Sequence, residues 1–291
     1  MRPAALLFRD WVVYPLLFAA WAGAMYCVHG RYSYVGTPPP GISLGASRPA
    51  AAIKATIDDI AQKQRLLSSE KSIAGRAATL EAVGAAFARL YDFTRTPGYL
   101  DSAEAFCGRA AAAEPASVSA HSLLGRILTE KRDFPGAVAQ YRAALARDPR
   151  SAALNQTIGI LLWFDLKQPL RAKPYLEKTL GLDSLFPTVN YVLGVIDLDQ
   201  RDSAAAVKRF ENELRVFRGS GRSPAAGPVD PADARTAACY AGLRLAFLYS
   251  TSFVDEAKAK DRFETYLSLE TDPTRRQESI REMNGYWKGA P

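Results

Sequence analysis

Few residues in this chain are of the types that carry out acid–base, nucleophilic or metal chemistry, and those few are scattered. The chain has only two histidines, His29 and His121. A nucleophile–base pair or a zinc site needs several such groups brought together. The spacing predicts a core position for His121 on a packed helix face. His29 flanks an apolar run, which favours an interfacial role over haem ligation, since no CxxCH sequence surrounds it.

Two acidic pairs are the remaining candidates for chemistry. Asp58 and Asp59 fall in a helix-like segment and are interpreted as part of a solvated face, whereas Asp197 and Asp199 are placed in a turn between helices. Neither pair has partners that would complete a metal site. The sequence also contains no P-loop, no GxGxxG after a strand and no GxSxG. We therefore expect a protein that is not an enzyme, with no cofactor and no metal.

Composition and charge indicate an ordinary globular protein with a basic surface. The chain has 291 residues, 48% hydrophobic and 23% charged, with a net charge of +7. The basic residues are dispersed, with no run of five or more, so nucleic-acid binding is not predicted. The three cysteines form neither a CxxC motif nor a dense disulfide framework. Cys107 and Cys239 are interpreted as small apolar packing residues.

An apolar run near the N-terminus has the length of a membrane span. Trp11 to Val28 holds 18 residues without a charge, which is the lower limit for crossing a bilayer, and aromatic residues stand near both of its ends. Arg2 and Arg9 precede it, which slightly favours an N-terminus on the cytoplasmic side. We expect a single-pass anchor in a bacterial inner membrane, with the rest of the chain in the periplasm.

Two other interpretations of this run stay open. Ala22 to Ala24 fits a small-x-small cleavage site, so the run could be a cleaved signal peptide, and a helix buried in protein is the third possibility. The expected segments are an anchor over 1–30, a Pro/Gly-rich linker over 31–50 and an amphipathic capping helix over 51–79.

A spacing of 34 to 35 residues organises the middle of the chain. Gly125, Gly159 and Gly194 follow one another at intervals of 34 and 35, each directly after a leucine or isoleucine. Pro115 and Pro149 are also 34 apart. Internal periods of this length are typical of stacked two-helix units, in which neighbouring units bury each other's apolar faces.

The clearest unit runs from Val118 to Asp148. Its first helix carries the Leu124–Gly125 pair, and its second helix carries Ala137, Tyr141 and Ala144 before Pro149. Small residues let two antiparallel helices approach closely, and a large residue fills the space beside them. This pattern resembles the tetratricopeptide repeat (TPR) family. The resemblance implies an all-α, right-handed α-solenoid that binds proteins.

Further units are weaker versions of the same pattern. The unit over 152–183 has one extra residue, which we place in its turn, and the unit over 186–218 has Glu213 where a small residue is expected, which predicts a splayed helix pair. Degenerate units precede and follow, with a Gly/Pro/Ser loop over 219–233. The sequence thus predicts about five TPR-like helix pairs over 80–273 and a capping helix and tail over 274–291.

A partner would bind on the concave face lined by the first helices of the stacked units. This groove is expected to be basic at one end and apolar in the middle. Tryptophan, tyrosine and arginine are frequent at binding hot spots, although Trp163 and Tyr191 could instead only pack between repeats. The predicted groove residues are Arg89, Ser122, Arg126, Gln156, Ile160, Trp163, Tyr191 and Val195.

The sequence thus favours a membrane-anchored scaffold or assembly factor that gathers protein partners beside the bilayer, with no nucleic-acid or small-molecule partner. The alternative is a stoichiometric accessory subunit of a larger membrane complex. In that case the small residues of the apolar run, Ala19 to Ala24, would support contact with other spans.

Overall fold

The structure, a computed structural model, describes residues 47–219 and 231–288. Throughout these two ranges the regular structure is helical. The helices are α2 (Ser47–Ser69), α3 (Ile73–Thr94), α4 (Pro97–Ala113), α5 (Val118–Glu130), α6 (Phe134–Arg147), α7 (Ala152–Ile160), α8 (Pro169–Leu182), α9 (Val189–Asp199), α10 (Ser203–Gly219), α11 (Pro231–Thr251), α12 (Glu256–Leu269) and α13 (Pro273–Lys288). A π-helical turn, η1 (Leu161–Asp165), continues α7.

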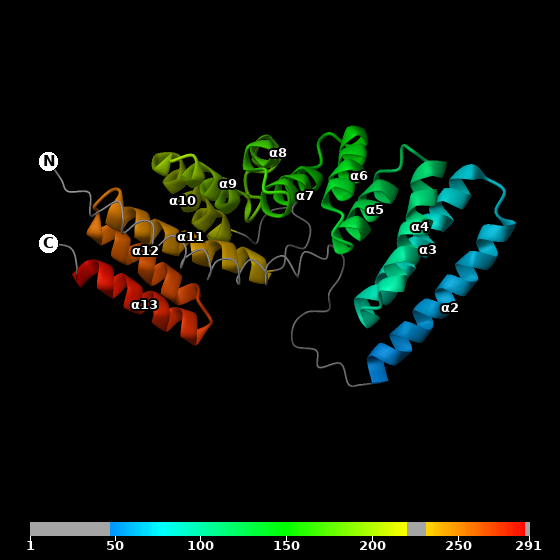
Figure 1. The fold of residues 1–291 in the computed structure, drawn as a ribbon, viewed down its shortest axis with the longest axis horizontal. Coiled ribbons are helices and arrows are strands. Elements are labelled where there is room, and N and C mark those ends of the chain that lie inside the picture. Colours follow the sequence, from blue (N-terminus) through cyan, green and yellow to red (C-terminus); the bar gives the residue numbers. More distant parts are fainter. Residues whose placement is uncertain (1–46, 220–230, 289–291) are drawn as a thin grey trace. The chain divides into compact units, whose positions relative to one another are not determined.

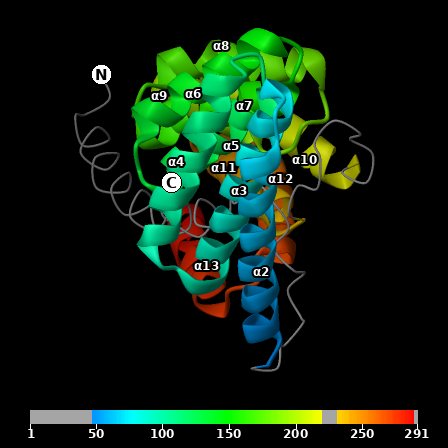
Figure 2. The same ribbon diagram turned by 90° about the vertical axis from the view of Figure 1, so that its right-hand side faces the viewer.

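Successive helices pair into hairpins, and each hairpin packs on the next (Figure 1). The pairs are α3 with α4, α5 with α6, α7 with α8, α9 with α10 and α11 with α12. α2 lies along α3, as both views show (Figure 2). The all-α array of TPR-like hairpins expected from the 34-residue spacing is confirmed for the described residues.

The membrane-span prediction falls on residues that the structure does not describe. Trp11 to Val28 lies outside the described ranges, as do residues 31–46 of the linker predicted over 31–50, whose last four residues belong to α2. Inside those ranges, no helix is both long enough and apolar enough to cross a bilayer.

In the three middle hairpins, a glycine of the first helix meets a large residue of the second. A Cβ atom added to Gly125 would lie 3.0 Å from the Tyr141 ring, and one added to Gly194 would lie 2.6 Å from the Phe210 ring. A Cβ atom added to Gly159 would lie 2.6 Å from Leu176 Cδ2. The repeated glycines are therefore required by close helix approach, as their spacing predicts.

Local hydrogen bonds set where the helices of these units begin. The side-chain oxygens of Ser117, Asp133 and Ser151 accept backbone N–H groups three residues ahead, at 3.1, 3.0 and 3.2 Å. These are N-caps for α5, α6 and α7, and they satisfy donors that the first helical turn leaves unpaired. In all five hairpins the turn between the two helices contains a residue in the left-handed region. These residues are Arg95, Arg132, Lys167, Arg201 and Val254, with φ between 51° and 63°.

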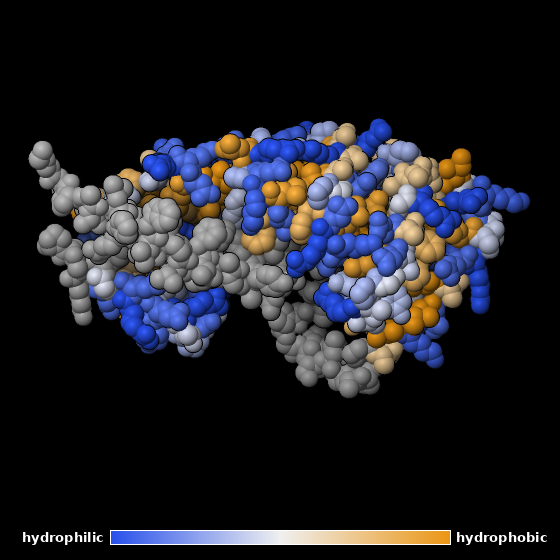
Figure 3. Space-filling model, viewed as in Figure 1, coloured by the Kyte–Doolittle hydropathy of each residue, from blue (hydrophilic) through white to orange (hydrophobic). Residues whose placement is uncertain are grey.

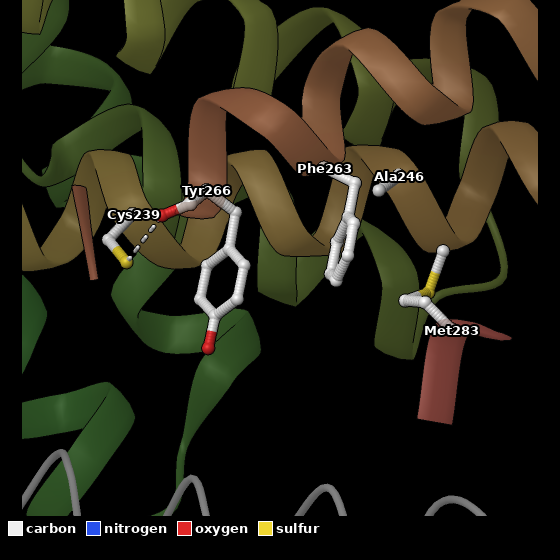
Figure 4. Packing of buried hydrophobic residues seen from close by; sticks show 5 residues of the cluster. All are labelled: Cys239, Ala246, Phe263, Tyr266 and Met283. Atoms are coloured by element: carbon white, nitrogen blue, oxygen red, sulfur yellow. Dashed lines mark hydrogen bonds between the residues drawn. The ribbon is translucent and has the colours of Figure 1, made fainter. Parts of the chain in front are cut away.

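The C-terminal helices close around one apolar cluster (Figure 4). Ala246 of α11, Phe263 and Tyr266 of α12 and Met283 of α13 are all buried, and the Cys239 thiol of α11 donates to the Tyr266 carbonyl oxygen at 3.9 Å. α13 thus covers the apolar side of the last hairpin, which is the role of a capping helix.

The structure differs from the sequence analysis at three boundaries. The stretch 51–79 is not one helix, because α2 ends at Ser69 and α3 starts at Ile73 behind an N-cap in which Ser72 Oγ accepts from the Gly75 N–H at 2.9 Å. α11 begins at Pro231, inside the expected loop. The extra residue of the 152–183 unit lies in the π-helical turn η1, where the Leu166 N–H donates to the Leu161 carbonyl oxygen at 3.0 Å, rather than in the turn after it.

Candidate functional site

The predicted groove residues lie on the first helices of successive hairpins, but most of them are buried. Arg89 on α3 is exposed and Ser122 on α5 is half-buried. The other six are at most 9% exposed: Arg126, Gln156, Ile160, Trp163, Tyr191 and Val195. Their assignment as partner contacts stays a prediction, and any partner that uses them must reach side chains that are covered in this structure.

The two arginines of the predicted basic end each face a carboxylate of an earlier helix. Arg89 Nη2 lies 3.3 Å from Asp59 Oδ2 of α2, so Asp59 joins two helices and is not only part of a solvated face. Arg126 Nη1 lies 3.7 Å from Asp92 Oδ2 of α3, and its buried Nε makes no hydrogen bond within the described chain. The Arg126 guanidinium therefore has one N–H donor, at Nε, that is not used by the described chain.

The middle of the predicted groove is organised by a buried carboxylate that the sequence did not identify as important. Glu213 of α10 accepts the backbone N–H of Thr188 at 2.7 Å and that of Tyr191 at 3.2 Å. Gln156 Nε2 donates to Thr188 Oγ1 at 3.2 Å. Glu213 thereby satisfies the unpaired donors at the N-terminus of α9, where Thr188 provides no side-chain cap.

The position of Glu213 corrects the expectation of a splayed pair. Glu213 is fully buried, and α9 still approaches α10 closely at Gly194. Burial raises the pKa of the Glu213 carboxyl to about 7, against the effect of the backbone donors that surround it. This buried group therefore titrates near neutral pH while it fixes the backbone next to Tyr191.

A second buried carboxylate joins three helices. Asp197 Oδ1 lies 2.7 Å from Lys173 Nζ of α8, and its Oδ2 lies 3.7 Å from Arg209 Nε of α10. Asp197 and Asp199 are part of α9 and not of a turn, because α9 runs to Asp199. The described contacts make Asp197 a link between helices.

The remaining candidates for chemistry have structural surroundings. His121 is half-buried, with Nδ1 2.8 Å from Gln140 Oε1 of α6. Cys107 and Cys239 are buried, and burial raises the pKa of each thiol to about 12, which keeps it protonated. Within the described ranges, no group of three or more His, Cys, Asp or Glu side chains is placed to hold a metal ion.

Trp163 stands in the π-helical turn η1. The extra residue of that turn changes the angular position of every side chain after it, because a π-turn advances the helix by one residue. Trp163 lies beside Phe164, with 6.0 Å between ring centroids, while Lys167 stands over the Phe164 ring at 4.5 Å. Sequence spacing alone could not place this tryptophan.

Comparisons with known proteins identify the fold. No family model and no curated protein matches the chain. Among solved structures, it is similar to BtubC (BKLC) from P. vanneervenii, with 18% identity over 82% of this chain and 93% of that chain and a TM-score of 0.54. It is also similar to the C-terminal part of a TPR repeat-containing protein from Cytophaga hutchinsonii, with 14% identity, 80% and 98% coverage and a TM-score of 0.53. A structure of MamA matches with 17% identity, 66% and 94% coverage and a TM-score of 0.50. The described chain therefore has a TPR-like fold.

Proposed function

We propose that this protein is a non-enzymatic scaffold that binds partner proteins through the first helices of its hairpins. The observation that carries the proposal is the nesting of the hairpins, in which first helices of neighbouring units contact each other, α3 with α5 and α9 with α11. Stacking of this kind builds an extended surface from equivalent positions of successive units, which is how repeat arrays bind polypeptides.

The chemistry of this surface favours a polypeptide with acidic and apolar side chains. At one end, Arg126 has an unpaired Nε, and Ser122 stands one turn before it on the same side of α5. In the middle, Ile160, Val195, Trp163 and Tyr191 are apolar but covered in this structure, so a partner contacts them only where binding uncovers them. An extended segment would place a carboxylate at the first end and apolar side chains along the rest.

We also propose that Trp11 to Val28 holds this scaffold at a bacterial inner membrane with the array in the periplasm. The support for this tether is the 18-residue run without a charge and its aromatic flanks. The tether predicts that the full chain resists extraction by alkaline carbonate and that a chain lacking residues 1–30 is released. Release of the full chain would contradict the tether and leave the scaffold proposal standing.

A photo-crosslinking amino acid at Ser122 tests the binding surface. Ser122 is half-buried, and its hydroxyl donates to the Val118 carbonyl oxygen within α5. We expect irradiation of membranes that hold the full chain to give a discrete polypeptide adduct at Ser122. The matched control is Lys178, an exposed residue of the second helix α8, where the same adduct is not expected.

Two results would contradict the scaffold proposal. Equal adducts at Ser122 and Lys178 would show contact without a preferred surface, and an absence of adducts at both positions would show no partner at all. A stable stoichiometric assembly on sizing after mild detergent extraction would instead favour the accessory-subunit alternative. Trp163→Ala is a poor test, because removing a buried tryptophan costs about 3–5 kcal/mol of stability whatever its role in binding.

A further inference from the structure

A hollow on the second helices, away from the predicted groove, gathers three arginines. Its cavity volume is about 360 Å³. It is lined by residues of α10 and by Arg262 of α12. Both helices are labelled in Figure 1. The lining residues are Glu211, Asn212, Leu214, Arg215, Arg218 and Arg262.

One of these arginines is already matched by a carboxylate. Glu211 Oε1 accepts from Arg262 Nε at 2.9 Å and from the Tyr249 hydroxyl of α11 at 3.3 Å. Arg262 Nη1 also pairs with Asp261 of its own helix. The Glu211–Arg262 pair is half-buried and joins α10, α11 and α12, so it belongs to the packing of these helices.

The other two arginines have no carboxylate partner in the described part of the chain. Arg215 Nη2 donates to the neutral Asn212 Oδ1 at 2.8 Å, which orients its guanidinium without neutralising it. Arg215 and Arg218 are exposed and stand three residues apart near the C-terminal end of α10, so they lie on one side of the helix. Two adjacent cations repel each other, and this repulsion is relieved when an anion binds between them.

We propose that this hollow binds an acidic segment of a partner protein, with its carboxylates paired to Arg215 and Arg218. Guanidinium groups bind carboxylates through two parallel N–H···O bonds, and this geometry makes a pair of arginines favour carboxylate ligands. Leu214 also lines the hollow, but its side chain is buried, so the arginines are the groups that a ligand would contact there. This surface is independent of the first-helix groove, because it stands on α10 and α12.

The residues around the hollow favour carboxylates over phosphate and over a lipid surface. The Glu211 carboxylate adds a negative charge among the lining residues, which opposes a dianionic phosphate more strongly than a singly charged carboxylate. A bilayer offers a broad plane, whereas these cations are confined to one hollow. On the face drawn in Figure 3, hydrophobic residues appear as separate patches among hydrophilic ones, without one continuous apolar field.

The test measures binding of a fluorescent peptide rich in glutamate to the full chain by anisotropy. Its control probe is the same peptide with every glutamate replaced by glutamine. We expect Arg215→Gln with Arg218→Gln to weaken binding of the acidic peptide by about tenfold, with no binding of the control probe by either protein. Both arginines are exposed, so an unchanged melting temperature is expected to accompany the loss.

The matched control variant is Arg171→Gln with Lys178→Gln, which removes two exposed cations from α8 and changes the net charge by the same amount. We expect it to bind the acidic peptide as the wild type does. An equal loss in both variants would overturn the proposal by showing a general charge effect. Displacement of the peptide by anionic phospholipid vesicles, but not by neutral ones, would also overturn it in favour of a membrane surface. Each of these results leaves the photo-crosslinking test of the first-helix groove unaffected.

Discussion

Glu213→Ala is expected to lower the free energy of unfolding by about 3 kcal/mol or more, because it leaves buried backbone donors without an acceptor. The Thr188 and Tyr191 N–H groups both donate to this carboxylate, and each buried donor left unpaired costs about 1–3 kcal/mol. The measurement is urea unfolding followed by far-UV circular dichroism, with Lys178→Ala on the exposed side of α8 as the control. A loss as small as that of the control would contradict the capping role of Glu213.

Comparing the wild type with Glu213→Gln reveals how the ionisation of Glu213 changes stability with pH. The folded-state pKa of Glu213 is raised to about 7 from an ordinary value of 4.5, so the folded state holds this proton more tightly than the unfolded state. The contribution of Glu213 to stability is therefore largest below the unfolded pKa, falls as pH rises from about 4.5 to about 7, and is constant above that range. The shift corresponds to about 3 kcal/mol.

We expect Glu213→Gln to remove this decline, because glutamine does not ionise. Burial also raises the pKa of two other carboxyl groups, Asp199 and Glu282. Subtracting the unfolding free energy of the variant from that of the wild type at each pH removes their effect and leaves that of Glu213. The two proteins are compared by urea unfolding at several pH values across this window. A decline of the same size in both would show that another group causes it.

Gly194→Ala is expected to destabilise the protein, although alanine is normally the better residue inside a helix. The added Cβ would lie 2.6 Å from Phe210 Cε1 and 2.9 Å from Cδ1, and the Phe210 ring is fully buried. Displacing a packed ring costs about 1–3 kcal/mol, which exceeds the gain of roughly 1 kcal/mol from removing a helical glycine.

The matched control for this prediction is Gly108→Ala. Gly108 lies inside α4, and an added Cβ would meet no atom within 4 Å. We expect this substitution to stabilise the protein by about 0.5–1 kcal/mol through helix propensity alone. Thermal unfolding of the two variants should therefore shift in opposite directions, and a shift upward in both would contradict close packing at the hairpin contacts.

The sequence predicts the hairpins well because their signal is local and repeated. Gly125 and Tyr141 are a small residue and a large one at a fixed interval, and the packing requirement that relates them recurs in the next two units. In the first hairpin Gly84 meets Cys107, but the interval from Gly84 to Gly125 is longer than the period, so the spacing does not indicate this pair. In this degenerate unit the close contact between the two helices is kept, although the 34-residue spacing is not.

The candidate site was harder to predict because it depends on contacts distant in sequence. Glu213 stands 25 residues from Thr188, and only the folded hairpin brings its carboxylate to the start of α9. A glutamate at a small-residue position, together with a helix start that lacks a capping side chain, is the signal that could have indicated it. Trp163 lies buried in a π-helical turn, which the sequence spacing shows only as an insertion.

Hydrogen exchange of the full chain, with and without the partner trapped at Ser122, tests the central claim that first helices form the binding surface. The account predicts slower exchange in α5, α7 and α9 when the partner is bound, with exchange in the second helices α6 and α8 unchanged. Protection confined to α6 and α8, or an unchanged pattern throughout, would contradict it.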